Sequence, residues 1–156
     1  YAFGNSFDVV YDNVKTISFF GELKADFSKN VSFGVSGTFS SYTTDVQAEA
    51  WNLPGLQVKA NLDFNITEKL YAGTSVFFVG ERKDIFSYTS LLRDESVTTT
   101  LDSYFDLNAH VGYKYNERWT MFLKGNNLAS QDYQKWLNYP VQGIQVLLGA
   151  SYKFDF

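Results

Sequence analysis

The chain ends in a strict alternation of apolar residues with small or charged ones, and this pattern constrains the fold more than any other stretch. From Leu148 onward every second residue is apolar, and the last three of these are Tyr152, Phe154 and Phe156. The intervening residues are Gly149, Ser151, Lys153 and Asp155. A period of two indicates a β-strand with one apolar and one polar face. Three alternating aromatics at a chain end are typical of the closing strand of an outer-membrane barrel, where they reach the membrane interface.

The same alternation recurs along the chain and predicts eight antiparallel strands. Several are longer than the about 5–6 residues that are usual in soluble sheets. They match the roughly 9–11 residues that cross a bilayer at a tilt. We expect strands at Phe3–Tyr11, Thr16–Ser28, Asn30–Tyr42, Leu56–Ile66, Leu70–Gly80, Tyr104–Tyr115, Trp119–Asn127 and Ile144–Phe156.

Charge separates between the two phases of these strands. From the second strand onward the apolar phase contains no charged residue, although 19% of the chain is charged. We therefore predict that Leu62, Val111 and Leu148 face lipid. The opposite phase holds five acids and five lysines: Glu22, Lys24, Asp26, Lys59, Asp63, Asp106, Lys114, Lys124, Lys153 and Asp155.

Alternation alone does not say which face points inward, because a soluble lipocalin-like barrel and a membrane barrel share it with opposite orientation. Connection lengths favour the membrane case. Tight turns at 28–30, 67–69 and 116–118 alternate with long loops at 43–55, 81–103 and 128–143. Short periplasmic turns and long extracellular loops are the pattern of outer-membrane barrels. Aromatics would gather at the short-turn end: Phe27, Phe33, Phe64, Tyr113, Tyr115, Trp119, Tyr152, Phe154 and Phe156.

Composition excludes several other classes. The 156 residues include no Cys, which suits an oxidising compartment. Aromatics reach 19%, with 15 Phe and 11 Tyr, as the interface girdles of a barrel require. A net charge of −4 argues against nucleic acid as a partner. The chain lacks a signal peptide and begins with Tyr1, so we expect it to be mature or cut from something longer.

Several segments of the chain combine into a recognisable order of motifs. In the middle, Ala50–Gly55 enters one strand and Gly80–Lys83 leaves the next. Near the end, a strand runs into an Asn-Leu turn, an aromatic loop with Pro and Gly, and the closing strand: Gly125–Leu128, Tyr133, Trp136, Asn138–Pro140, Gly143 and Leu148–Phe154. This order resembles the end of the TonB-dependent receptors, in the form found in Bacteroidetes-type bacteria.

The resemblance implies a bacterial outer-membrane protein for substrate uptake, of which this chain covers the final part of the barrel. The family's N-terminal TonB box and plug domain have no counterpart here, so no substrate is implied. The terminal strand resembles the C-terminal sorting signal that the barrel-assembly machinery reads, carried here by Gly149, Tyr152, Phe154 and Phe156. The implied partners are outer-membrane lipid, the assembly machinery during insertion, and a ligand or surface protein at the extracellular loops.

Candidate sites lie in the lumen and in the loops. His110, the only histidine, stands in the polar phase between Asn108 and Gly112. A catalytic histidine beside a serine occurs in outer-membrane phospholipases, but no local serine motif supports that role, so we predict a hydrogen-bonded lumenal side chain. The ten lumenal charges would pair inside a small closed barrel. In a larger barrel they would line a channel wall or face a plug, and the sequence leaves both open.

The loops hold exposed aromatics that are candidates for binding a ligand or partner protein: Trp51, Tyr88, Tyr133, Trp136 and Tyr139. Interface anchoring and loop packing are the alternative roles. We predict no enzyme activity, no cofactor and no metal site, since one His without Cys does not form the usual zinc sets.

Together these patterns predict one all-β domain over residues 1–156, an antiparallel up-and-down transmembrane barrel of eight strands that is part of a larger barrel. The predicted function is receptor-like uptake across the outer membrane. The alternative is a non-transporting structural barrel whose loops bind a partner. Because the receptor-like motifs extend along the whole chain, we expect the strand at Phe3–Tyr11 to be an edge that does not pair with Ile144–Phe156. An unpaired edge is not tolerated in a bilayer, so further strands or another protein would have to cover it.

Overall fold

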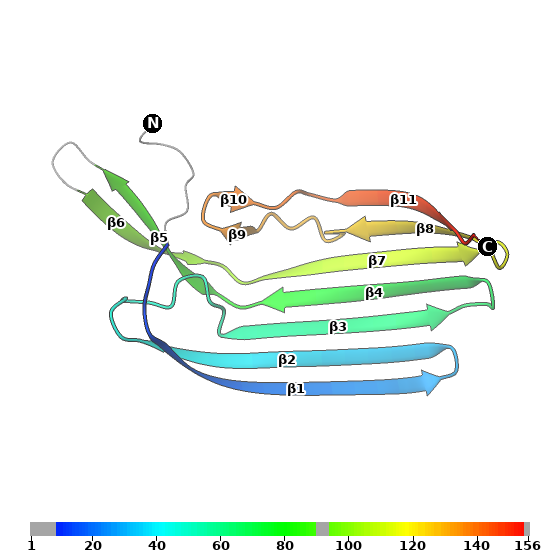
Figure 1. Ribbon diagram of the computed structural model, residues 1–156, viewed down its shortest axis with the longest axis horizontal. Helices are drawn as coiled ribbons and strands as arrows, with labels where there is room; N and C mark the ends of the chain where they lie inside the picture. Colours follow the sequence, from blue (N-terminus) through cyan, green and yellow to red (C-terminus); the bar gives the residue numbers. More distant parts are fainter. Residues whose placement is uncertain (1–8, 90–93, 155–156) are drawn as a thin grey trace.

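The computed structural model describes residues 9–89 and 94–154, and their fold is a single curved β-sheet with two small hairpins attached (Figure 1). All strand pairings are antiparallel. The main sheet has seven strands in the order β1-β2-β3-β4-β7-β8-β11. They are β1 (Val14–Ser28), β2 (Val31–Thr44), β3 (Leu56–Asn65), β4 (Leu70–Val79), β7 (Tyr104–Lys114), β8 (Trp119–Asn126) and β11 (Gln145–Tyr152).

These seven strands confirm the all-β antiparallel prediction, but the total differs from eight. The described residues form eleven strands, because both of the longer predicted loops contain a hairpin. The predicted loop 81–103 contains β5 (Arg82–Thr89) and β6 (Asp94–Leu101), which pair with each other. The predicted loop 128–143 contains β9 (Gln134–Trp136) and β10 (Tyr139–Pro140). Neither hairpin has an apolar face of period two long enough to reveal it in the sequence.

The predicted strand Phe3–Tyr11 is wrong where it can be judged. Residues 9–13 are irregular, and residues 1–8 lie outside the described part. Val9, Val10 and Tyr11 have strand-forming side chains, but no neighbouring strand pairs with them in the main sheet. Within residues 9–89 and 94–154 the sheet is open, with β1 and β11 as its edges. The N-terminal edge of the sheet, which was predicted at Phe3–Tyr11, is therefore formed by β1.

The tight turns form through local side-chain bonds, which explains why the sequence predicted them. Thr67 Oγ1 accepts hydrogen bonds from the backbone N–H of Lys69 and Leu70 at 3.2 and 2.9 Å. Asn116 Oδ1 does the same for Arg118 and Trp119 at 3.0 and 2.8 Å. Such Ser, Thr and Asn turns need no distant partner.

The register aligns the apolar phase into unbroken rows across the sheet. One row runs through Ala25, Phe33, Leu62, Thr74, Ala109, Gly125 and Val146. The next runs through Val31, Phe64, Ala72, Val111, Leu123 and Leu148. A shift of one residue in the pairing of a strand would move all its side chains to the opposite face. The observed register therefore keeps the apolar and polar phases on separate faces of the sheet.

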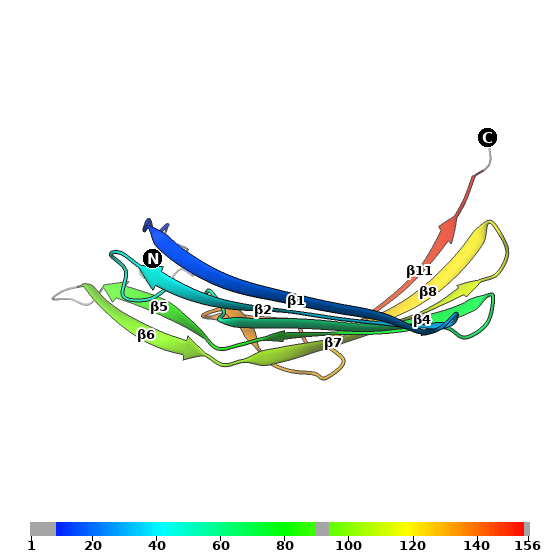
Figure 2. The same cartoon turned by 90° about the horizontal axis from the view of Figure 1, so that it is seen from below.

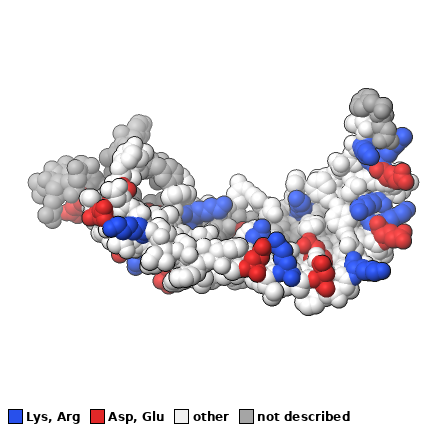
Figure 3. All heavy atoms as spheres, turned by 60° about the horizontal axis from the view of Figure 1, so that its bottom comes forward, with Lys and Arg blue, Asp and Glu red and all other residues white. Residues whose placement is uncertain are grey.

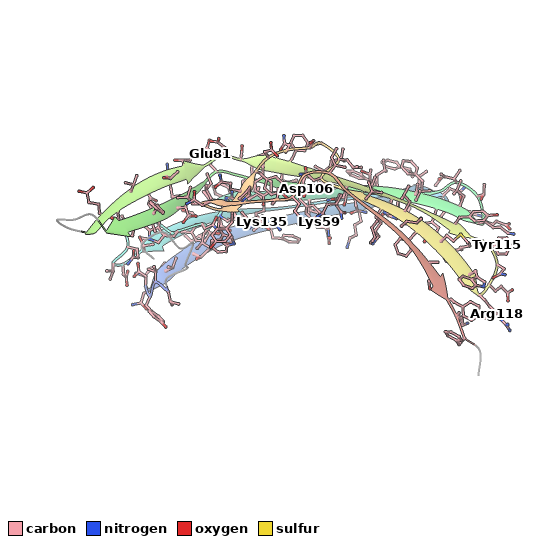
Figure 4. All side chains as sticks on the ribbon, turned by 90° about the horizontal axis from the view of Figure 1, so that it is seen from above. Lys59, Glu81, Asp106, Tyr115, Arg118 and Lys135 are labelled. Atoms are coloured by element: carbon pink, nitrogen blue, oxygen red, sulfur yellow. The ribbon has the colours of Figure 1, made fainter. Side chains whose placement is uncertain are left out.

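The sheet is curved, with one concave and one convex side (Figure 2), and Lys59 of the polar phase lies under the arch (Figure 4). Side chains converge on the inner side of a curved sheet and spread apart on the outer side. A Cβ added at Gly73 would lie 2.5 Å from Asp63 Oδ1, and one at Gly112 would overlap the Tyr71 ring. At Gly21, in the apolar phase, nothing lies within 4 Å of such a Cβ. Crowding of the polar phase therefore identifies it as the inner face.

The sheet is one layer thick and encloses almost no core. Leu101 is the only buried large hydrophobic side chain in the described residues. The convex face instead exposes its apolar side chains, as with Phe19 at 69% and Leu148 at 76%. The described residues contain no helix of the length and hydrophobicity that a membrane span requires.

Candidate functional site

The charges predicted to share one face do so in the described part of the chain. The register places Asp26, Ser32, Asp63, Gly73, His110 and Lys124 in one row of the concave face. The second row beyond it on the same face contains Glu22, Ser36, Lys59, Phe77 and Asp106. In the space-filling view positive and negative side chains are interspersed along the hollowed molecule rather than gathered into patches of one sign (Figure 3).

These charges contact aromatic rings and amides more than they contact one another. Among residues 9–89 and 94–154 the one ion pair joins the exposed side chains of Lys24 and Glu22 at 3.0 Å. Three lysines lie over rings, at 5.4–5.8 Å from ammonium nitrogen to ring centroid. The pairs are Lys59 with Phe77, Lys114 with Tyr71, and Lys124 with Phe122. Cation–π contacts of this kind stabilise a lysine without a carboxylate.

His110 belongs to the most crowded part of this face. Asp63 Oδ1 and His110 Cε1 both approach the open space above Gly73, which has no side chain to separate them. Asn61 donates a hydrogen bond to Asp63 at 3.0 Å, and the Tyr71 ring meets the His110 ring edge-on at 6.1 Å. A hollow of about 280 Å³ follows on the β7–β8 side, lined by Ser75, Phe77, Asn108, His110, Lys124 and Asn126 among others.

The most organised polar cluster lies at the loop end of the same face. Residues 127–143, here called the strap, connect β8 to β11 and extend beyond their ends beside the start of β7 (Figure 1). Tyr133 of the strap stacks flat on Tyr104, with ring centroids 3.8 Å apart and planes 6° from parallel. Its hydroxyl donates to Asp106 Oδ2 at 2.7 Å. Burial and this bond to the carboxylate raise the pKa of Tyr133 well above its ordinary value.

Arg82, the first residue of β5, holds the other side of this stack. Its guanidinium lies 5.1 Å from the Tyr104 ring centroid and donates to the backbone carbonyl of Gln134 at 2.9 Å. The side chain is only 5% exposed. No carboxylate of the described residues lies within ion-pair distance of it. A buried cation with a ring and a carbonyl as its partners is an unusual arrangement, because burial of a charge ordinarily requires an ion pair.

Long-range hydrogen bonds join the strap to the loop at 45–55 and to β5. Asn52 Nδ2 donates to the carbonyl of Lys135 at 2.9 Å, and Asp84 Oδ2 accepts from the backbone of Leu137 at 2.9 Å. At the base of the strap, Asn127 is 4% exposed and donates to the carbonyls of Gln131 and Gln142 at 3.0 and 3.1 Å.

Figure 4 shows Lys59 under the arch of the sheet and Tyr115 with Arg118 at the opposite, tight-turn end.

The strap also gathers the backbone strain of the described residues. Among the described residues four non-glycine residues have a positive φ. Three of them belong to the strap: Asn127, Ser130 and Asn138. The fourth is Asn52, which is hydrogen-bonded to the strap. Three buried side-chain atoms lack a hydrogen-bond partner: Asn52 Oδ1, Arg82 Nε and Asp106 Oδ1. Each belongs to a residue bonded to one of Tyr133, Gln134 and Lys135.

The predicted loop aromatics do not form one cluster. Tyr133 enters the stack, whereas Trp51 donates to Gln47 within its own loop at 3.0 Å. Trp136 pairs with Tyr139 across the β9–β10 hairpin. The side chain of Tyr88 lies outside the described part. Sequence reasoning missed Arg82, Tyr104 and Asn52, since no local pattern links residues so far apart in the chain.

The terminal aromatics lie together at the tight-turn end. The Tyr152 ring is 4.8 Å from that of Trp119 and 4.7 Å from that of Phe154. Gly149 lies opposite Phe122 on the concave face, where a Cβ would overlap that ring. Phe156 and Asp155, also predicted as site residues, lie outside the described residues. The sorting role of this segment stays a prediction.

The described residues contain no group of three or more His, Cys, Asp or Glu side chains arranged to hold a metal ion. Near Gly73, His110 and the acid Asp63 approach each other, and within residues 9–89 and 94–154 they belong to no such group.

Comparison with known proteins relates the chain to receptors by fold. No protein-family model and no curated protein sequence matches it. Among solved structures, the ferripyoverdine receptor of the *Pseudomonas aeruginosa* outer membrane superposes with a TM-score of 0.76 at 12% identity, over 92% of this chain and 20% of the receptor. The ferric-catecholate import receptor Fiu of *E. coli* gives 0.71 at 16% identity, over 92% and 22%. FpvAI in complex with pyocin S2 gives 0.74 at 13% identity, over 92% and 20%.

The chain therefore shares the fold of part of TonB-dependent siderophore receptors and spans about a fifth of their length. Two of these neighbours are receptors by name. That the present chain is not an enzyme stays a prediction.

Proposed function

We propose that this chain forms part of the wall of an outer-membrane β-barrel through which a Gram-negative bacterium takes up a solute in the manner of TonB-dependent receptors. The convex face would contact lipid, and the concave face would line the lumen. The tight turns would lie on the periplasmic side and the strap on the extracellular side. The further assignment to the Bacteroidetes type rests on the sequence resemblance alone.

One observation carries this proposal. The sheet has an apolar face and a polar face, the rows of the apolar face continue across six or seven strands, and neither face is covered by a second layer. In water such a surface would aggregate, since monomeric soluble proteins rarely expose large continuous apolar patches. In a bilayer the same face is buried in hydrocarbon, which is the arrangement of outer-membrane barrels.

The open edges fit this proposal as well. β1 and β11 each have one side without a neighbour in the described sheet. Backbone groups in hydrocarbon have no water to bond, so each edge must pair with another strand in the membrane. Further strands that close the sheet into a larger barrel would supply those partners.

Uptake is tested in a strain that lacks the gene and is complemented with the natural full-length protein or a variant. Cells grown under iron limitation are given radiolabelled ferric siderophores, with and without a protonophore. We expect uptake of at least one compound that depends on the gene and stops when the membrane is de-energised. Normal outer-membrane levels of the protein without any gene-dependent uptake would contradict a receptor function.

The strap gives specific support to a second function, a barrel that binds a partner without transport. Its bonds to Asn52, Arg82 and Asp84 join the strap, the loop at 45–55 and the β5–β6 hairpin at one end of the sheet. A neighbour with this fold, FpvAI, is solved in complex with pyocin S2. The same uptake experiment separates the two functions, because a non-transporting barrel would reach the outer membrane at normal levels and transport none of the compounds.

A further inference from the structure

The cluster around Tyr133 has the form of a binding site that is occupied by a segment of its own chain. The Tyr133 ring lies flat on Tyr104 at 3.8 Å, its hydroxyl donates to Asp106 at 2.7 Å, and the next carbonyl, of Gln134, accepts from Arg82 at 2.9 Å. These are three different kinds of recognition directed at two consecutive residues: stacking, a carboxylate acceptor and a cationic donor.

Tyr104, Asp106 and Arg82, here called the cradle, keep buried polar atoms that the strap does not satisfy, and this points to a ligand. Arg82 is 5% exposed and carries a full positive charge, yet its partners in the described residues are a neutral carbonyl and a ring. Its Nε and the second oxygen of Asp106 are buried without hydrogen-bond partners. Buried polar atoms without partners destabilise a structure, and charge-assisted bonds from Arg to a carboxylate are stronger than bonds to a carbonyl.

We infer that Tyr104, Asp106 and Arg82 form a site for a phenolic acid, and that Tyr133 and Gln134 occupy it when the strap is closed. The ligand's ring replaces the Tyr133 ring on Tyr104, its hydroxyl donates to Asp106, and its carboxylate pairs with Arg82. This inference rests on the proposed function in one respect: that function places the site at the extracellular end of the barrel lumen.

Movement of the strap is a necessary part of this exchange. Tyr133 and Gln134 already occupy the positions against Tyr104, Asp106 and Arg82 that the ligand would take, so a ligand binds there only after these two residues leave. Asn127, Ser130 and Asn138, with positive φ, lie on both sides of the segment that would move. Left-handed backbone at non-glycine residues is held by surrounding contacts and is commonly found where loops switch between conformations.

The experiment uses the full-length protein in detergent and the probe N-acetyl-L-tyrosine, which has a phenol and a free carboxylate. Tyr133→Ala empties the cradle and leaves Tyr104, Asp106 and Arg82 in place. We expect this variant to bind the probe at least tenfold more tightly than the unaltered protein, because the probe no longer competes with the strap. Tyr42→Ala is the matched control: Tyr42 is also at the loop end and donates to the carbonyl of Pro54, away from the stack.

Two analogues test each recognition element separately. N-acetyl-L-phenylalanine lacks the hydroxyl, and N-acetyl-L-tyrosinamide lacks the negative charge. Both should gain less than threefold in affinity from Tyr133→Ala. In the Tyr133→Ala background, Arg82→Gln should remove the preference for the free acid over the amide. An equal gain for all three compounds, or no gain in Tyr133→Ala, would overturn the inference.

Strap movement has its own readout, which guards against a variant that fails to fold. The chain has no Cys, so Gln134→Cys introduces a single thiol next to the stack without removing Tyr133. Saturating N-acetyl-L-tyrosine should increase its labelling rate with a maleimide at least threefold. An unchanged rate would also overturn the inference. Since these measurements use folded protein in detergent, they can succeed or fail independently of the uptake assay in cells.

Discussion

The concave and convex faces of the sheet use their side chains in opposite ways. On the concave face side chains contact one another, as Lys59 does with Phe77 and Asp106 with Tyr133. On the convex face large apolar side chains such as Phe19 and Leu148 are mostly exposed. The concave face is therefore organised by the protein itself, whereas the convex face depends on an apolar surrounding medium. Three predictions on the sheet and its strap test this difference, and a fourth concerns a loop outside the sheet.

The largest effect is expected from a charge on the convex face. Leu62→Arg places a cation in an apolar row and should lower the free energy of unfolding in a bilayer by roughly 2–4 kcal/mol near the midplane. The matched control is Ser75→Arg, whose side chain would enter the hollow of the concave face. Unfolding in lipid vesicles measures both. Equal destabilisation by the two variants would contradict the assignment of faces.

The next effect concerns the bond that holds the strap to the concave face. Tyr133→Phe keeps the stack on Tyr104 but leaves Asp106 without its donor, and should cost about 1.5–3 kcal/mol, the usual range for a hydrogen bond to a charged group. Because the folded protein raises the pKa of Tyr133, this stabilisation is complete below the ordinary tyrosine pKa of 10.0 and is lost as pH rises through the folded pKa. Unfolding of the Phe variant should lack that alkaline dependence.

Paired glycine substitutions sharpen the comparison of crowding. Gly112→Ala on the concave face would displace the Tyr71 ring from its contacts with His110 and Lys114, and should cost about 1 kcal/mol, the low end for overpacking. Gly21→Ala on the convex face meets nothing within 4 Å and should be neutral or slightly stabilising. If Gly21→Ala were the more harmful change, the curvature would have been assigned to the wrong face.

The smallest effect lies outside the sheet, where contacts are exposed to water. Asp12 accepts hydrogen bonds from the backbone of Gln47 and Val46, and these bonds lower the pKa of its carboxyl. The contacts are therefore present above the ordinary Asp pKa and are lost as pH falls through the lowered one. Hydrogen exchange at Val46 and Gln47 should speed up over that acidic range, and Asp12→Asn should reduce the pH dependence. Exchange that is independent of pH would show that Asp12 does not hold this loop.

The difference between local and distant contacts explains what the sequence could predict. The rows of the sheet and its tight turns follow from period-two patterning and from residues such as Thr67 and Asn116, whose effects act within a few positions. The β5–β6 hairpin was missed because Thr98, Thr99 and Thr100 do not alternate with apolar residues. The Arg82–Tyr104–Tyr133 cluster was missed because its members are joined only by the folded chain.

The membrane orientation of β3 tests the account most directly. Single cysteines placed from Gln57 to Asp63, in a chain that has none of its own, can carry spin labels whose accessibility to oxygen and to a water-soluble nickel complex is measured in bilayers. We predict alternation with a period of two: positions 58, 60 and 62 accessible to oxygen, and positions 57, 59, 61 and 63 accessible to the nickel complex. The reverse alternation, or accessibility to nickel at every position, would contradict a sheet whose convex face lies in lipid.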